Sequence, residues 1–219
     1  MKSSWEDTVS QSRYHFDSKR QDPRWDTVIG LGQLDPDQWR DDLDTIIDNS
    51  KPATWETRGY KGQGNDIPSK DLASEEYDIE RVGADPKMVI SNLNWQLPRS
   101  LQQVADNVAR GDPRYRIQVQ YPGQGWTRHI DKLQKWSPKS PHDVVRIFIQ
   151  LTDWKPGQFW EFGNYNYSGW RAGEVITFDW ANVPHCTANA GHHPRVTLQV
   201  TGVQSAATER YLNFLKNSS

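Results

Sequence analysis

From residue 114 onward, the apolar residues of the chain recur at every second position, and this spacing limits the fold more than any other feature of the sequence. Successive residues of a β-strand point to opposite faces, so a period of two predicts strands with one buried face. Turns rich in Pro and Gly separate the apolar runs. Residues 114–202 are therefore expected to form about eight short strands, the number found in a jelly roll, or else a small barrel.

The first half of the chain shows a helical period instead. Apolar residues recur at helical spacing within 35–47, where Asp35 can cap a helix and Pro36 suits its first position. A second apolar stripe over 97–108 predicts another helix, which ends before Gly111.

The chain is expected to form a single domain over residues 1–219, since β-rich folds of about 200–250 residues often stay undivided. We predict an N-terminal arm and helices over 1–113, a β core over 114–202, and a tail or short helix over 203–219. Residues 51–75 are rich in Gly, Pro, Lys and Asp and predict a loop. The expected fold class is mainly β, with flanking N-terminal helices.

Composition excludes several classes of protein and site. The formal net charge is -2, which provides no field to attract nucleic acid or an anionic membrane. The chain shows neither a membrane-spanning run nor the apolar stretch of a signal peptide, so a soluble, cytoplasmic protein is expected. A lone Cys186 cannot form an internal disulfide or a cysteine-only zinc site. A metal would therefore have to be held by His, Asp and Glu.

The first pair of candidate ligands is His129 and Asp131. Residues two apart on an extended strand share a face, so this imidazole and this carboxylate can reach one point. The motif is short and occurs often by chance, so a surface histidine near an aspartate is the alternative interpretation.

A second histidine strengthens the metal interpretation. His185 follows Asp131 by 54 residues, enough for several strands and a return to a neighbouring one. Two histidines and one carboxylate make the facial triad of non-haem Fe(II), which leaves coordination positions open for a co-substrate and dioxygen. The same residues could also hold zinc.

Arg195 and Thr197 favour iron over zinc. They begin the last alternating strand and share a face, so a guanidinium and a hydroxyl can bind the same carboxylate. An Fe(II) enzyme that uses 2-oxoglutarate must hold the distal carboxylate of that co-substrate, whereas zinc hydrolysis needs no such arginine. The alternative is a surface arginine at the start of an edge strand.

With these residues in this order, 114–202 resembles the Fe(II)/2-oxoglutarate-dependent oxygenases. Residues 121–125 (Tyr-Pro-Gly-Gln-Gly), which lead into Arg128-His129-Ile130-Asp131, are similar to the prolyl hydroxylase group. Residues 170–179 (Trp-Arg-Ala-Gly-Glu-Val-Ile-Thr-Phe-Asp), followed by His185 and Arg195, are similar to the aspartyl/asparaginyl β-hydroxylase group. That second group lacks the carboxylate ligand, so Asp131 places this chain beside it rather than inside it.

The resemblance implies a double-stranded β-helix with Fe(II) held by His129, Asp131 and His185 at one open end. It also implies O2 as a substrate and hydroxylation of a C–H bond, with 2-oxoglutarate converted to succinate and CO2. Halogenating members of the family lack the carboxylate ligand, so Asp131 argues against halogenation.

Two further residues are candidates for binding the co-substrate. Arg146 alternates with Val145 and Ile147, so it lies on the opposite face of its strand, and a matching arginine in the β-hydroxylase group contacts a carboxylate. Tyr121 could donate its hydroxyl to 2-oxoglutarate, or it could pack in the core.

The substrate is expected to be a peptide or a small molecule, with the side chain of Asp, Asn or Pro hydroxylated. One alternative is a non-catalytic jelly-roll module whose aromatic residues bind carbohydrate or peptide. The chain has 11 tryptophans, some of which could serve in this way. Another is a metalloenzyme of the same fold that uses Zn(II) or Mn(II) for non-oxidative chemistry.

Overall fold

The structure is a computed structural model, and it describes residues 27–52, 92–94, 96–108, 114–131, 133–134 and 137–218. The predicted arm over 1–25 and the glycine-rich centre of the predicted loop, 61–65, lie outside the described residues. None of the described helices is long and apolar enough to cross a membrane.

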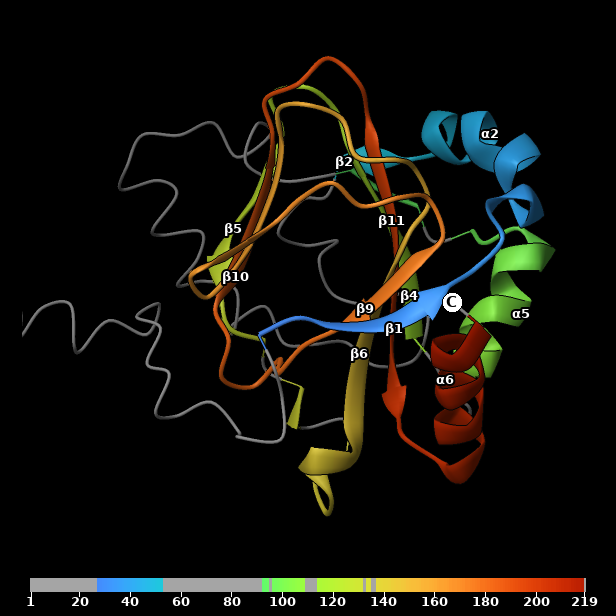
Figure 1. The fold of residues 1–219 in the computed structure, drawn as a ribbon. Coiled ribbons are helices and arrows are strands. Elements are labelled where there is room, and N and C mark those ends of the chain that lie inside the picture. Colours follow the sequence, from blue (N-terminus) through green and yellow to red (C-terminus); the bar gives the residue numbers. More distant parts are fainter. Residues whose placement is uncertain are drawn as a thin grey trace, which may run out of the picture.

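Two antiparallel sheets make up the β core (Figure 1). The larger sheet has seven strands in the order β1-β9-β6-β11-β4-β3-β2, and the smaller has four in the order β5-β10-β7-β8. The strands are β1 (Ile29–Gln33), β2 (Lys51–Pro52), β3 (Asn92–Asn94), β4 (Arg114–Gln120), β5 (Gly125–His129), β6 (Val144–Gln150), β7 (Gln158–Phe162), β8 (Tyr165–Tyr167), β9 (Glu174–Thr177), β10 (His185–Asn189) and β11 (Arg195–Val203).

The eight strands β4 to β11 follow the winding of a jelly roll. Strands β4, β6, β9 and β11 lie in the larger sheet, while β5, β7, β8 and β10 form the smaller one. The chain therefore passes between the sheets repeatedly, and each sheet pairs strands that are distant in sequence. This order confirms the prediction of a mainly β, jelly-roll core with about eight strands over 114–202.

Alternation along the strands of the larger sheet separates two environments. The face turned towards the helices is aliphatic, with side chains at most 3% exposed: Ile117, Val119, Val145, Ile147, Ile149, Val196, Leu198 and Val200. Burying one such side chain contributes about 1.5–3 kcal/mol to folding. The opposite face looks towards the smaller sheet and is largely polar, with Arg116, Gln118, Gln120, Arg146, Gln150, Arg195, Thr197 and Gln199.

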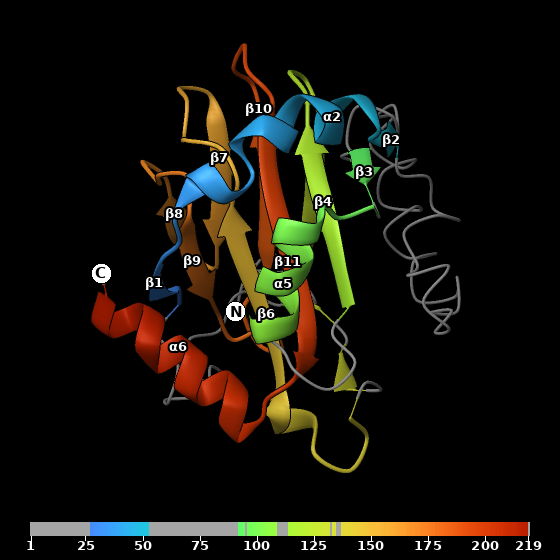
Figure 2. The ribbon, with the colours of Figure 1, turned by 90° about the vertical axis from the view of Figure 1, so that its right-hand side faces the viewer.

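Helices cover the aliphatic face of the larger sheet, away from β5 and β10 (Figure 1). They are α2 (Leu43–Asp48), α5 (Arg99–Val108) and α6 (Ala206–Ser218). Seen from the side, α5 crosses in front of β6, β11 and β4 (Figure 2). The helix over 97–108 is confirmed with a start at Arg99, and α6 is the helical alternative predicted for the C-terminal segment.

The helix predicted over 35–47 is only partly present, because two 3-10 turns, Pro36–Gln38 and Arg40–Asp42, precede α2. Asp35 does act as a cap, accepting a hydrogen bond from the backbone N–H of Asp37 at 3.0 Å. The interruption falls at Trp39, whose φ of -134° is not helical. Trp39 is 1% exposed and its indole N–H donates to the carbonyl of Leu151 at 3.1 Å, so this tertiary anchor overrides the local helical preference.

Gly173 joins the N-terminal segment to the core. Its N–H donates to the carbonyl of Gln150 at 2.7 Å, and its own carbonyl accepts from Leu34 at 2.8 Å. Its φ is +92°, and an added Cβ would lie 2.0 Å from the carbonyl oxygen of Leu34.

We expect Gly173→Ala to lower the free energy of unfolding by about 1–3 kcal/mol more than Gly169→Ala. Gly169 also has a positive φ, +73°, but no atom lies within 4 Å of an added Cβ, so its variant reports backbone strain alone. Urea unfolding of both variants measures the difference. Equal losses would contradict the assigned contact with Leu34.

Candidate metal centre

The two histidines face each other across one pair of strands. His129 ends β5 and His185 begins β10, and they are direct partners in the antiparallel register. A bulge between this pair and the next, Thr187 and Trp126, shifts the register at this point. Asp131 lies two residues beyond the end of β5 and is 8% exposed. The fold thus brings the three residues of the predicted triad together at one end of the smaller sheet.

The donor atoms of these three residues lie within 4.8 Å of one another. The Nε2 atom of His129 is 3.5 Å from Oδ1 of Asp131, and Nε2 of His185 is 3.8 Å from Oδ2 of Asp131. Metal bonds of about 2.0–2.2 Å place neighbouring ligand atoms roughly 3 Å apart, so small side-chain shifts would close the set around one ion. The donor set fits a divalent metal.

A backbone carbonyl fixes which nitrogen of His185 is available to a metal. Nδ1 lies 3.3 Å from the carbonyl oxygen of Val183, and since a carbonyl can only accept, Nδ1 carries the proton. Nε2 is then the lone-pair donor, and this is the nitrogen that faces Asp131. The preceding turn is held by Asp179, whose carbonyl accepts from the N–H of Val183 at 2.9 Å.

Both buried ligands have the protonation state that a metal needs. Burial raises the pKa of Asp131, but Arg146 and the two histidines outweigh burial and hold this pKa well below its usual range. Burial, followed by the neighbouring His129, lowers the pKa of His185 to about 3. A carboxylate and a neutral imidazole are the ligating forms, so metal binding would not have to displace protons from these two residues near neutral pH.

Arg146 supports the triad from the larger sheet. Its Nη1 donates to Oδ2 of Asp131 at 2.6 Å, and its Nε donates to the hydroxyl of Thr201 at 3.1 Å. It faces away from Val145 and Ile147, as predicted from alternation. The described structure therefore gives Arg146 a role towards the aspartate ligand, and the contact with a co-substrate carboxylate that the resemblance implied stays a prediction.

Aromatic rings surround the histidines and limit the access of water. Phe178 lies 4.7 Å from His185 between ring centroids, Phe162 stacks on the same imidazole at 5.9 Å, and Trp126 lies 6.4 Å from His129. Such an apolar wall lowers the local dielectric constant and strengthens every charge interaction at the centre.

Arg195 is fully buried, and its guanidinium has no hydrogen-bond partner in the described part of the chain. None of its three guanidinium nitrogens has an acceptor among the residues that the structure describes. The guanidinium carbon lies 4.6 Å from the ring centroid of Trp160, a cation–π contact. Burial lowers the pKa of Arg195 to about 9, so the group remains charged near neutral pH. A buried charge without an acceptor is costly, and this arrangement fits a site built for an anion.

Sequence reasoning missed two further donors that are buried without an acceptor in the described structure: the indole N–H of Trp160, whose ring contacts Arg195, and the side-chain amide of Gln150. The hydroxyl of the predicted Thr197 donates to Oε1 of Gln150 at 3.1 Å, which leaves the amide nitrogen of Gln150 for a ligand. The signal available in the sequence was that polar residues such as Gln150 alternate with apolar residues along a strand.

Tyr121 does not join this site. It directly follows β4, packs against the core under the helices, and donates its hydroxyl to the carbonyl of Ile47 at 3.2 Å. The packing alternative therefore describes Tyr121, and the predicted bond to 2-oxoglutarate is wrong for this structure. His192 and His193 lie in the turn after β10, at the far end of that strand from His185.

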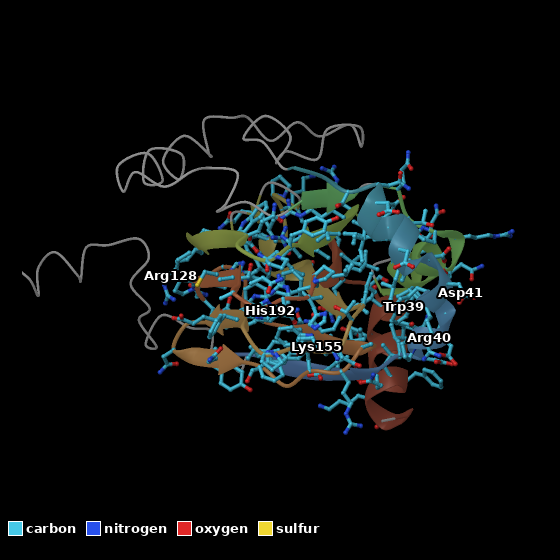
Figure 3. All side chains as sticks on the ribbon, turned by 90° about the horizontal axis from the view of Figure 1, so that it is seen from above. Trp39, Arg40, Asp41, Arg128, Lys155 and His192 are labelled. Atoms are coloured by element: carbon cyan, nitrogen blue, oxygen red, sulfur yellow. The ribbon has the colours of Figure 1, made fainter. Side chains whose placement is uncertain are left out.

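The cavity at the histidines is small in this structure. It has a volume of about 10 Å³, room for about one water molecule, and its lining includes His129, His185, Trp160 and Arg116. A cleft of about 730 Å³ lies elsewhere, lined by Trp39, Arg40 and Lys155 among others, and it contains none of the predicted site residues (Figure 3). The chemistry of the donor set, and not cavity size, identifies the candidate site.

Comparison with known proteins adds little to this geometry. No family model and no curated protein matches the chain. Among solved structures, the nickel complex of a non-heme monooxygenase has a TM-score of 0.44 at 11% identity, covering 82% of this chain and 74% of its own. A Pseudomonas putida prolyl-4-hydroxylase has a TM-score of 0.40 at 16% identity, covering 74% of this chain and 99% of its own.

A predicted oxalate decarboxylase from Thermotoga maritima has a TM-score of 0.35 at 16% identity, covering 52% of this chain and 82% of its own. All three scores are below 0.5, so none of them bears on what this chain does. The structure itself shows a jelly-roll core in which His129, Asp131 and His185 form a group that could bind a metal ion.

We expect Arg146→Gln to lower the free energy of unfolding of the metal-free protein by about 3–5 kcal/mol, because it leaves the carboxylate of Asp131 buried without its counter-charge. The double variant with Asp131→Asn should lose less than Arg146→Gln alone, and Mn(II) should restore part of the stability of the single variant. Urea unfolding with and without Mn(II) measures these differences in the free energy of unfolding. Equal losses in the single and double variants would contradict the pairing.

We also expect the stability of the metal-free protein to fall with acid because of His185. Folded His185 stays neutral down to about pH 3, whereas the unfolded chain protonates it below about pH 6.5. The contribution of His185 to the free energy of unfolding is complete above pH 6.5. It is lost between about pH 6.5 and 3, at up to about 1.4 kcal/mol per pH unit. His185→Gln should remove this slope and the exposed control His192→Gln should keep it; identical slopes would refute the assignment.

Proposed function

We propose that this protein is an Fe(II)/2-oxoglutarate-dependent oxygenase that hydroxylates an amino-acid side chain. One observation carries the proposal: a fully buried arginine, for which the described residues offer no acceptor, lies in the same barrel as a His/Asp/His triad. Trp160 stacks on this arginine and lines the cavity at the histidines. An organic anion that binds a metal at the triad with one end and Arg195 with the other would serve both sites at once.

2-Oxoglutarate has the required chemistry at its two ends. Its keto acid can chelate an ion held by His129, Asp131 and His185, because a facial triad leaves open positions. Its distal carboxylate can accept hydrogen bonds from the fork of Arg195, with the amide of Gln150 beside it. Zinc hydrolysis offers no use for Arg195, so the buried arginine favours the oxidative alternative.

Bound Fe(II) would supply the activation of O2, in a reaction in which 2-oxoglutarate and O2 yield succinate and CO2 and one oxygen atom enters a C–H bond. The protein's own residues contribute binding, charge and exclusion of water. Arg146 keeps Asp131 ionised and fixed in place, and Val183 orients Nε2 of His185 towards the metal position. Phe162 and Phe178 keep bulk water from the imidazole of His185.

The proposed substrate is an Asp, Asn or Pro side chain, in a peptide or in a free amino acid. The carboxylate of Asp131 occupies the place that halogenating enzymes of the resembling family use for halide, so hydroxylation is the proposed outcome. A cytoplasmic location, and partners limited to such substrates, remain part of this proposal.

We expect Arg195→Gln to weaken 2-oxoglutarate binding by roughly 30-fold to several thousandfold, equivalent to about 2–5 kcal/mol, because it removes a buried charge pair to a carboxylate. Fe(II) affinity should stay the same, since Arg195 is not among the metal ligands. Anaerobic titration of the Fe(II)-loaded protein, followed by the visible metal-to-ligand charge-transfer band, measures both constants.

Arg171→Gln, at an exposed turn, is the matched control and should leave both constants unchanged. Asp131→Ala should abolish the band and the release of succinate. A wild-type protein that shows no charge-transfer band would refute the proposed oxygenase activity. Bound zinc or manganese without succinate release would then indicate the non-oxidative metalloenzyme. A protein that binds no metal at all would indicate the non-catalytic binding module.

A further inference from the structure

The inner face of the jelly roll carries buried arginines beyond those assigned to the triad and the co-substrate. Four buried arginines lie on the larger sheet, with exposed fractions of 7% for Arg114, 6% for Arg116, 3% for Arg146 and 0% for Arg195. Arg146 is paired with Asp131, and Arg195 is assigned above to the distal carboxylate of the co-substrate. Arg116 has no role in that scheme.

Arg116 stands at the wall of the metal cavity. It lines the same space of about 10 Å³ as His129 and His185, together with Gln118 and Gln199. A group bound to this guanidinium would therefore lie close to the position of the metal. Arg114 precedes it by two residues on the same face of β4 but does not line this cavity.

Gln199 and Trp126 both contact the Arg116 guanidinium. Its Nη2 donates to Oε1 of Gln199 at 3.1 Å, and its carbon lies 5.0 Å from the ring centroid of Trp126. Gln199 is the direct register partner of Arg116 on β11, and Trp126 comes from β5, which ends at His129. The arginine is thus fixed between both sheets, next to the strand that carries a metal ligand.

We propose that Arg116 binds a carboxylate of the primary substrate and orients the adjacent carbon towards the metal, with the side chains of Gln118 and Gln199 beside it. This rests on the proposed function for the reaction, but the anion site is a separate assignment. The substrate then carries a negative charge within a few bonds of the reacting carbon. An aspartyl side chain or the terminal carboxylate of an amino acid fits, whereas neutral asparaginyl and prolyl groups in the middle of a peptide do not.

Arg116 places a guanidinium in the wall of the cavity that the two histidines line. In surroundings of low dielectric constant, a guanidinium favours a carboxylate over a neutral group of the same shape.

The test compares two probes that differ only in charge. N-acetyl-L-aspartic acid α-amide carries one carboxylate, and N-acetyl-L-asparagine α-amide replaces it with an amide of nearly the same shape. N-acetylglycine and its amide form a second pair for a terminal carboxylate. Each is titrated by calorimetry into full-length protein loaded with Mn(II) and saturated with 2-oxoglutarate, so that Arg195 is occupied and no turnover is required.

In wild-type protein we expect the anion of at least one pair to bind about tenfold or more tightly than its neutral partner. Arg116→Gln should abolish this preference, Arg116→Lys should retain part of it, and Arg114→Gln should keep it. Affinity for 2-oxoglutarate should be unchanged in all three variants.

No preference in wild type for either pair, or a preference that survives Arg116→Gln, would overturn the proposal. Loss of 2-oxoglutarate binding in Arg116→Gln would also overturn it, because Arg116 would then serve the co-substrate. If wild-type protein binds no 2-oxoglutarate but keeps an Arg116-dependent preference for the anion, the proposed oxygenase activity is contradicted and the anion site at Arg116 is supported.

Discussion

The buried ion pair between Arg146 and Asp131 is the interaction on which the geometry of the site depends. It joins β6 of the larger sheet to the segment that follows β5 of the smaller one, at a bond of 2.6 Å. Buried pairs seldom add much net stability, because desolvation offsets the attraction. Here the pair places the carboxylate between two histidines and keeps it ionised.

The interior of this jelly roll combines polar and aromatic side chains. Arginine and glutamine side chains fill the inner face of β4, and a second buried cluster that includes Phe148, Trp160 and Phe178 packs in the interior, apart from the aliphatic cluster under the helices. The strands of the larger sheet thus present stabilising aliphatic residues on one face and the polar residues of the candidate site on the other. This division explains why Arg195, which has no acceptor among the described residues, can be tolerated: Val196 and Leu198 on the same strand, β11, are fully buried in the aliphatic core.

Alternating apolar residues predicted the β core well, because a period of two fixes which residues share a face, and Arg195, Thr197 and Arg146 lie on the predicted face. The helix over 35–47 could not be predicted fully, since its interruption comes from the tertiary bond of Trp39 to Leu151. Arg116 and Gln150 belong to no motif and become visible only once the strands are paired. The assignment of 1–219 to a single domain stays a prediction.

The two halves of the proposed binding site lie on different sheets. The histidines belong to the four-stranded sheet, while Arg195 and Arg146 belong to the seven-stranded one. Facing sheets pack about 10 Å apart. A dicarboxylate that bridges metal and arginine would act as a removable cross-link between the layers, so the protein would be most rigid when it is ready to react.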